Sequence, residues 1–262
     1  MNKIMIAIDD GHGMETAGKR TPAFSDGRVM RENEFNSAVA DYLAEALKRN
    51  GFDVLMVAPD DTDVPLKTRV QIANDTRAKA YISIHANAFG TTWNGANGLE
   101  TWIYEKVMPD SETYRLAKCI HDALIKATGL RNRGMKRSSD LFVLKNTSMH
   151  AVLLECGFMT NEEEAALLMD EIYRRKCAEA ICRGVCAFYE KTYQEGVKEM
   201  DEQKKYQTIE EAPAWAQPLL RDMDVRDCIA DPEHLDMSWN MLRCMVLMDR
   251  YFESRMRELG LL

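Results

Sequence analysis

Short apolar segments alternate with longer amphipathic segments along the first 190 residues of the chain. The short segments have the length of buried strands, and the longer ones repeat apolar residues at the period of a helix. The expected strands are residues 4–8, 53–57, 81–85, 101–104, 142–144 and 151–155, and the expected helices are residues 34–50, 66–77, 111–128 and 162–190. This alternation predicts an α/β domain with a twisted, mostly parallel or mixed sheet flanked by helices.

The pattern changes near residue 190. Residues 191–207 are highly charged and lack an apolar period, which is typical of a linker. Residues 208–262 regain apolar positions, and Ser238 is an expected N-cap for an amphipathic helix. We therefore expect a catalytic domain at 1–190, a linker at 191–207 and a small helical module at 208–262.

Composition narrows the class of protein. The chain has 46% hydrophobic and 29% charged residues and a net charge of -8, without a basic run or a membrane-spanning stretch. These values indicate a globular protein, exclude a membrane span and argue against nucleic acid as a partner. The start of the chain has a short apolar run without the features of a signal peptide, and the 7 cysteines are odd in number. We expect synthesis in the cytoplasm with reduced thiols.

Candidate metal ligands lie where predicted strands end. His12 stands between two glycines directly after the first strand, and His85 closes the apolar run of another. Glu32 comes just before an expected helix, so its carboxylate can project inward from a helix N-terminus. Two histidines and one carboxylate are a ligand set of catalytic zinc sites, in which a fourth position stays open for water.

Glu155 is the candidate general base. It follows four apolar residues at the end of a strand, and a carboxylate in such a place is costly unless a metal, a partner or a raised pKa compensates. A carboxylate beside a zinc-activated water can take the proton of that water and pass it to a leaving amine. The other histidines, 121, 150 and 234, lie in contexts that favour structural or surface roles.

Five ordered motifs make the interpretation more specific. They are Ile8-Asp9-Asp10-Gly11-His12-Gly13, Glu32-Asn33-Glu34-Phe35-Asn36, Leu66-Lys67-Thr68-Arg69, Ser83-Ile84-His85-Ala86-Asn87 and Leu154-Glu155-Cys156-Gly157-Phe158-Met159-Thr160-Asn161. In this order they resemble the N-acetylmuramoyl-L-alanine amidases that have a type 3 amidase catalytic domain. The resemblance covers about residues 1 to 190. Residues 14–16, 57–58 and 149–151 depart from the usual family pattern without removing a ligand or the base.

The resemblance implies a zinc enzyme that acts on peptidoglycan. It implies that His12, Glu32 and His85 bind Zn²⁺, that Glu155 is catalytic, and that the substrate is the amide between N-acetylmuramic acid and L-alanine. We take Arg20, Asn87 and Arg133 as candidate contacts to the substrate, because arginine pairs with carboxylates in a fixed fork.

Two other functions stay open at this stage. A zinc peptidase or carboxypeptidase acting on stem peptides uses a similar ligand set, although the separation of His12 and Glu32 along the chain argues against it. A catalytically silent wall-binding protein would need the same pocket only to hold muropeptides. The tail resembles small modules of some clostridial prophage lysins, which implies wall binding or pairing into a homo-oligomer. It also implies action on the cell wall after release through a holin-type pore or lysis.

Overall fold

The computed structural model describes residues 3–59, 61–196, 205–211, 217–225, 237–238 and 245. The chain divides into two compact units, Met1–Glu195 and Gly196–Leu262. The boundary falls inside the predicted linker.

A mixed sheet of six strands forms the centre of the first unit, in the order β2-β1-β3-β6-β4-β5. The strands are β1 (Met5–Asp9), β2 (Asp53–Met56), β3 (Ala80–Asn87), β4 (Leu99–Tyr104), β5 (Asn132–Ser138) and β6 (His150–Phe158). β2, β1, β3 and β6 run parallel, whereas β4 is antiparallel to β6 and parallel to β5. The predicted α/β fold class is confirmed, with the sheet of the mixed kind.

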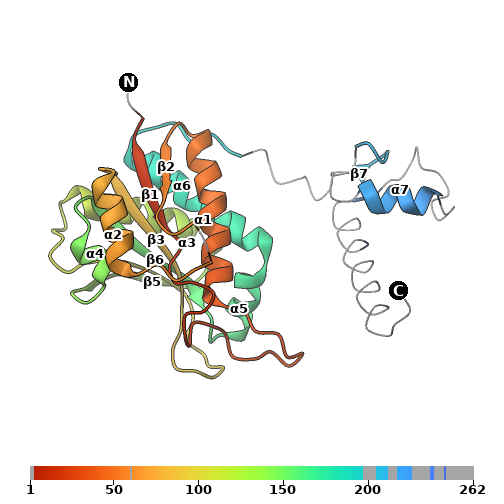
Figure 1. Ribbon diagram of the computed structural model, residues 1–262, viewed down its shortest axis with the longest axis horizontal. Helices are drawn as coiled ribbons and strands as arrows, with labels where there is room; N and C mark the ends of the chain where they lie inside the picture. The colour runs from red at the N-terminus through yellow and green to blue at the C-terminus, as the bar shows by residue number, and fades with distance from the viewer. Residues whose placement is uncertain are drawn as a thin grey trace. The chain divides into compact units, whose positions relative to one another are not determined.

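Helices cover both faces of this sheet (Figure 1). The isoleucines of β1 and β3 pack in one cluster with α1 (Glu32–Arg49), α3 (Glu112–Thr128) and α6 (Glu171–Phe188). Alternate residues, including Ala7 and Tyr81, pack in a second cluster with α2 (Leu66–Asp75) and α4 (Phe142–Asn146). This division follows from the period of two in a strand, which sends successive side chains to opposite faces.

Three local expectations are wrong or incomplete. Residues 142–144, which were expected to form a strand, lie in a helix. Three consecutive apolar residues do not define a period, so they do not distinguish a strand from a helix. The expected single helix at 162–190 is two helices, α5 (Glu162–Met169) and α6, because the Asp170 side chain caps α6 by accepting a hydrogen bond from Tyr173 N. β5 was not anticipated, since an edge strand rich in Arg and Lys lacks an apolar alternation.

The second unit is described in part. β7 (Lys205–Tyr206) pairs antiparallel with β8 (Met237–Ser238), and α7 spans Gln217–Val225. The helix expected after Ser238 lies outside the described residues, apart from the helical Met245. Within the described part of the chain, no helix has the length and apolar character needed to cross a membrane.

Candidate metal centre

Three predicted ligands converge at the carboxyl ends of β1 and β3. One ligand atom each from His12, Glu32 and His85 can be chosen so that all lie within 4.8 Å of one another. Glu32 lies between the two rings, with Oε1 2.9 Å from His85 Nδ1 and Oε2 3.6 Å from His12 Nε2. The structure therefore brings together the set that the sequence singled out.

The turn after β1 places His12 in a conformation that few side chains adopt. Gly11 and His12 have φ angles of 47° and 42°, and glycine enters this left-handed region without the steric cost of a Cβ. The carbonyl oxygen of His12 accepts a hydrogen bond from Asn33 Nδ2 at 3.2 Å. The turn is thus tied to the start of α1, which carries Glu32.

Glu32 is the first residue of α1 rather than part of the preceding loop. Its side chain is only 1% exposed. Glu34 closes the end of the helix by accepting a hydrogen bond from Arg31 N at 2.7 Å, as in a capping box. Because Glu34 supplies the capping carboxylate, the carboxylate of Glu32 is left for the interior.

The charges of the site suit a cation. Burial raises the pKa of Glu32, but the hydrogen bond and charge of His85 and the charge of His12 outweigh it, and the pKa falls to about 2. Burial lowers the pKa of His12 to about 4. The site therefore offers a carboxylate and an imidazole that is neutral near pH 7.

A buried oxygen of Glu32 provides a direct test of whether a metal fits. Oε2 is enclosed and accepts no hydrogen bond from the described residues, although Lys19 Nζ lies 3.5 Å away. A buried carboxylate oxygen without a hydrogen-bond partner is costly, and a divalent cation between Glu32 and the two imidazoles would satisfy it. Two nitrogens and a carboxylate oxygen are ligands that Zn²⁺ prefers.

Glu155 lies beside this cluster on β6. His85 and Glu155 are paired residues of the parallel strands β3 and β6, so their side chains leave the same face of the sheet. Burial raises the pKa of Glu155 to about 8, with the charge of His85 opposing the shift and that of Glu32 adding to it. Glu155 Oε2 is enclosed and has no hydrogen-bond partner among the described residues.

Two of the predicted substrate contacts meet at Glu100, which sequence reasoning missed. Arg133 Nε donates to Glu100 Oε1 at 2.6 Å, and Asn87 Nδ2 approaches Glu100 Oε2 at 3.4 Å. Glu100 is also the cross-strand partner of Glu155. Its signal in the sequence is a carboxylate directly before the expected strand at 101–104. Arg20 is exposed, and its backbone forms a β-bridge with Arg31.

The other described histidines have structural partners. His121 hydrogen bonds to Thr101 Oγ1 and Asn132 Oδ1 at 3.0 and 2.9 Å. His150 begins β6, at the end of the strand opposite to the predicted ligands, and contacts Thr113 Oγ1 at 2.9 Å. His234 lies outside the described residues.

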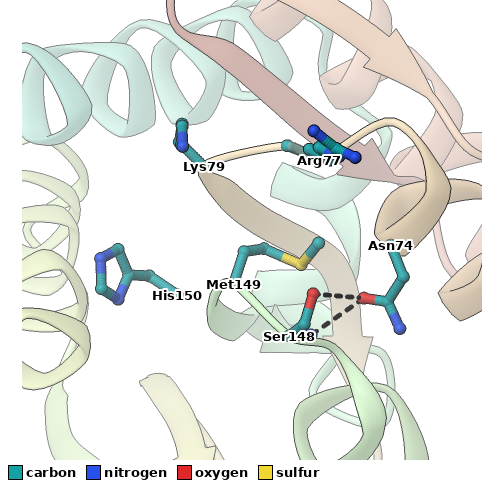
Figure 2. A pocket seen from close by; sticks show the side chains of 7 residues that line it. Asn74, Arg77, Lys79, Ser148, Met149 and His150 are labelled. Carbon is teal, nitrogen blue, oxygen red and sulfur yellow. Dashed lines mark hydrogen bonds between the residues drawn. The ribbon is translucent and has the colours of Figure 1, made fainter.

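A hollow of about 320 Å³ lies beside the starts of β3 and β6, near His150 (Figure 2). Its lining comprises Asn74, Arg77, Ala78, Lys79, Ser148, Met149 and His150. None of the three converging ligands reaches it, and Asn74 Oδ1 already accepts hydrogen bonds from Ser148 N and Oγ. The hollow is therefore separate from the cluster of His12, Glu32 and His85.

Similarity to known proteins agrees with the geometry. A family model described as N-acetylmuramoyl-L-alanine amidase matches residues 6–187. The chain belongs to this family. The amidase is 33% identical over 184 residues to the N-acetylmuramoyl-L-alanine amidase LytC of Bacillus subtilis, covering 70% of this chain and 35% of LytC. It is 34% identical over 186 residues to an endolysin of Bacillus phage SPP1, covering 69% of this chain and 64% of the endolysin.

Solved structures show the same fold. The catalytic domain of CwlV, an N-acetylmuramoyl-L-alanine amidase from Bacillus (Paenibacillus) polymyxa var. colistinus, is 32% identical, with a TM-score of 0.63 over 72% of this chain and 99% of that domain. The N-acetylmuramoyl-L-alanine amidase from Clostridium difficile 630 is 31% identical, with a TM-score of 0.65 over 72% of this chain and 98% of that chain. The similarity covers the first unit of the amidase.

Proposed function

We propose that this amidase hydrolyses the amide bond between N-acetylmuramic acid and L-alanine in peptidoglycan and that it depends on zinc. The observation that supports this most directly is the convergence of His12, Glu32 and His85 next to Glu155, in a chain of the N-acetylmuramoyl-L-alanine amidase family. A site of this composition suits hydrolysis of an unactivated amide, which needs a polarised carbonyl and a proton carrier.

Three residues hold the metal in this proposal. His12 and His85 would contribute imidazole nitrogens and Glu32 a carboxylate oxygen, the kind of ligand set that catalytic zinc sites use. A Zn²⁺ ion held there would supply Lewis acidity for the substrate carbonyl and the attacking water. The protein contributes by keeping the three ligands together in a partly buried site.

Glu155 moves the proton. It accepts a proton from the attacking water and then donates it to the leaving nitrogen of alanine, so that the amine departs neutral. Burial holds the pKa of Glu155 at about 8 in the metal-free protein, and the charge of a bound cation would lower this value. A carboxyl group with a pKa near neutrality both takes and returns a proton efficiently.

Arg20, Asn87 and Arg133 are proposed to contact the muramyl peptide. The Arg133 side chain is 30% exposed and pairs with Glu100 through Nε. The remaining N–H donors of the Arg133 guanidinium suit a carboxylate of the stem peptide. Asn87 is half-buried two residues beyond His85 on β3 and offers an amide for the peptide backbone.

Digestion of purified peptidoglycan, followed by mass analysis, tests the proposal. Free stem peptides that begin with L-alanine, lost on chelation and restored by zinc, are the expected products. Fragments cut within the stem peptide would instead favour a zinc peptidase. No release at all would favour a silent wall-binding protein.

Residues 208–262 are proposed to bind the wall or to pair subunits, and the enzyme to reach the wall after release through a holin-type pore or lysis. Deletion from Thr208 onward tests the role of the module by sedimentation with purified walls and by measurement of the mass in solution. Lower wall binding supports targeting and a lower subunit number supports pairing. A truncated protein unchanged in both would contradict the two roles.

A further inference from the structure

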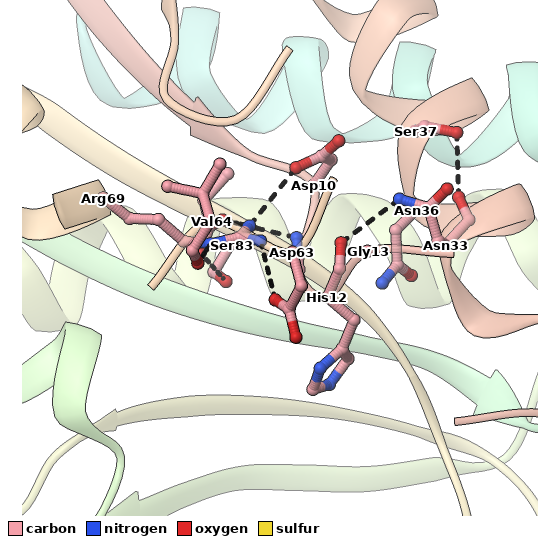
Figure 3. Close-up of polar contacts among 12 residues, drawn as sticks. Asp10, His12, Gly13, Asn33, Asn36, Ser37, Asp63, Val64, Arg69 and Ser83 are labelled. Atoms are coloured by element: carbon pink, nitrogen blue, oxygen red, sulfur yellow. Dashed lines mark hydrogen bonds and ion pairs between the residues drawn. The ribbon is translucent and has the colours of Figure 1, made fainter. Parts of the chain in front are cut away.

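Arg69 is a buried cation on α2 that the proposed reaction does not use. Its side chain is 1% exposed. Nη1 lies 2.6 Å from Asp9 Oδ1 and 3.3 Å from Asp10 Oδ1, and Nη2 lies 3.5 Å from Asp63 Oδ1. Nε donates to the carbonyl oxygen of Val64 at 2.7 Å, and Figure 3 shows the arginine with Asp10, Asp63 and Val64. Burying a guanidinium carries a desolvation cost that close partners must offset, so the position of Arg69 sets the positions of these carboxylates.

One branch of contacts leads from Arg69 to His85. Asp9, held by Arg69, accepts a hydrogen bond from Ser83 Oγ at 2.7 Å, and Ser83 Oγ lies 3.1 Å from His85 Nε2. A hydroxyl has one proton to donate, and Ser83 gives it to the carboxylate. The Ser83 oxygen therefore accepts a hydrogen bond from His85 Nε2–H.

This contact decides which nitrogen of His85 faces the metal site. With Nε2–H directed to Ser83, Nδ1 is the nitrogen left for the metal site, and it lies in hydrogen-bond contact with Glu32 Oε1 at 2.9 Å. Gly11 confines the ring from another side, because a Cβ at Gly11 would lie 2.4 Å from His85 Cε1. The contacts of its two nitrogens and the packing against Gly11 therefore fix the orientation of the ring.

A second branch leads from Arg69 to the turn that carries His12. Asp63 faces Arg69 through Oδ1 and accepts a hydrogen bond from Thr16 Oγ1 through Oδ2 at 2.7 Å. The same Thr16 oxygen accepts a hydrogen bond from Gly13 N at 2.9 Å. A Cβ at Gly13 would lie 2.3 Å from Asp63 N, so the residue after His12 packs directly against the Asp63 backbone.

We propose that Arg69 is a positioning residue for both histidines of the metal centre, acting on His85 through Asp9 and Ser83 and on His12 through Asp63 and Thr16. The Ser83 hydroxyl commits His85 to binding a divalent cation through Nδ1. This inference rests on the proposed zinc site. It assigns a role to two motif residues, Arg69 and Ser83, that neither bind the metal nor touch the reacting atoms.

Zinc affinity of the full chain tests the first branch. The probe is Zn²⁺ alone, titrated into chelator-treated protein in competition with a chromophoric chelator. Ser83→Ala is expected to weaken zinc binding about 10-fold to 100-fold, which is the usual effect of losing a partner that orients a metal-binding histidine. Unchanged affinity in Ser83→Ala would overturn the proposal.

Thr101→Val is the matched control. Thr101 is also a buried strand residue whose hydroxyl contacts an imidazole, that of His121. Within the described part of the chain, this pair forms no hydrogen bond or ion pair with Arg69 or with a predicted ligand. The control variant is expected to lose thermal stability on a scale similar to Ser83→Ala while binding zinc as the unchanged protein does. Equal weakening of zinc binding in both variants would show a general loss of stability and would contradict a specific role of Ser83.

The second branch has its own pair of variants. Thr16→Val removes the hydroxyl and keeps the shape of the side chain, whereas Thr16→Ser keeps the hydroxyl. We expect weaker zinc binding in Thr16→Val and near-complete rescue in Thr16→Ser. Equal zinc affinity in both variants would contradict the proposal that Arg69 positions His12.

Nitrogen-15 spectra of the histidine rings give a readout that is independent of activity. In the zinc-loaded protein, His85 is expected to show a protonated Nε2 and a coordinated Nδ1, and coordination through Nε2 would overturn the inference. If the unchanged protein binds no zinc, the proposed function fails together with the inference. If it binds zinc and hydrolyses peptidoglycan while Ser83→Ala and Thr16→Val bind zinc equally well, only the inference fails.

Discussion

His85 on β3 and Glu155 on β6 are direct neighbours in the sheet, although 70 positions separate them in the chain. The first belongs to the cluster of proposed metal ligands, and the second has the raised pKa expected of a proton carrier. Neighbouring parallel strands lie about 4.8 Å apart, so the sheet itself sets the spacing between the proposed metal centre and the proposed base.

Replacing Glu155 by Gln tests the base. The amide has nearly the same shape but cannot accept and return a proton at neutral pH, so peptidoglycan hydrolysis is expected to fall by about 10² to 10⁴-fold, the usual contribution of a general base. Zinc content, measured by atomic absorption, should stay the same. Glu163→Gln, on the exposed surface of α5, is the control and should keep full activity; near-normal hydrolysis by Glu155→Gln would refute the assignment.

Replacing His85 by Ala tests the metal site. Loss of one of three protein ligands is expected to abolish stoichiometric zinc binding and, with it, hydrolysis. His150→Ala is the matched control, because His150 begins the strand that carries Glu155 but contacts Thr113 at the opposite end of that strand. A His85→Ala protein that retains one zinc per chain would exclude His85 as a ligand.

The pH dependence of stability tests the environment of Glu155. In the metal-free protein its pKa is about 8, against an ordinary value of 4.5. Between these values the folded state holds a proton that the unfolded state has lost, so the free energy of unfolding falls as pH rises, by at most about 1.4 kcal/mol per pH unit. This contribution to stability is fully present below the ordinary pKa of 4.5 and is lost as the pH rises through the folded-state pKa of about 8.

Glu155→Gln removes this contribution, so the comparison isolates it from the opposing shift of His12. Urea unfolding of both chelator-treated proteins between about pH 5 and about pH 8 measures the difference in slope. We expect a flatter profile for the variant. Parallel profiles would show that Glu155 ionises normally.

The packing of α3 against α6 is tested at Gly184. A Cβ at this position would lie 2.5 Å from the Cα of Ile120, which forces the helices apart. Gly184→Ala is therefore expected to lower the free energy of unfolding by about 1 to 3 kcal/mol, although alanine is the better helix former. Ala187→Gly on the exposed face of the same helix measures the helix-propensity effect alone. A stabilised Gly184→Ala protein would contradict the tight contact.

Much of the fold and of the candidate site follows from local patterns in the sequence. The α/β class is visible because core strands and amphipathic helices have different apolar periods. His12, His85 and Glu155 stand out because each follows or ends an apolar strand with a side chain that is costly to bury, and Glu32 stands out because it directly precedes an expected helix. β5 and the break at Asp170 escape such patterns, since an edge strand needs no apolar alternation and a cap needs no change in period.

By itself, the sequence determined the family, the order of the main elements and the identity of the candidate ligands and base, because these depend on local periodicity and on ordered motifs. Only the tertiary structure decided which of these residues meet and through which atoms. Arg69, Ser83 and Glu100 make their contacts through burial and strand register, as in the pairing of Glu100 with Glu155. Such contacts join residues far apart in the chain, and no local pattern encodes them.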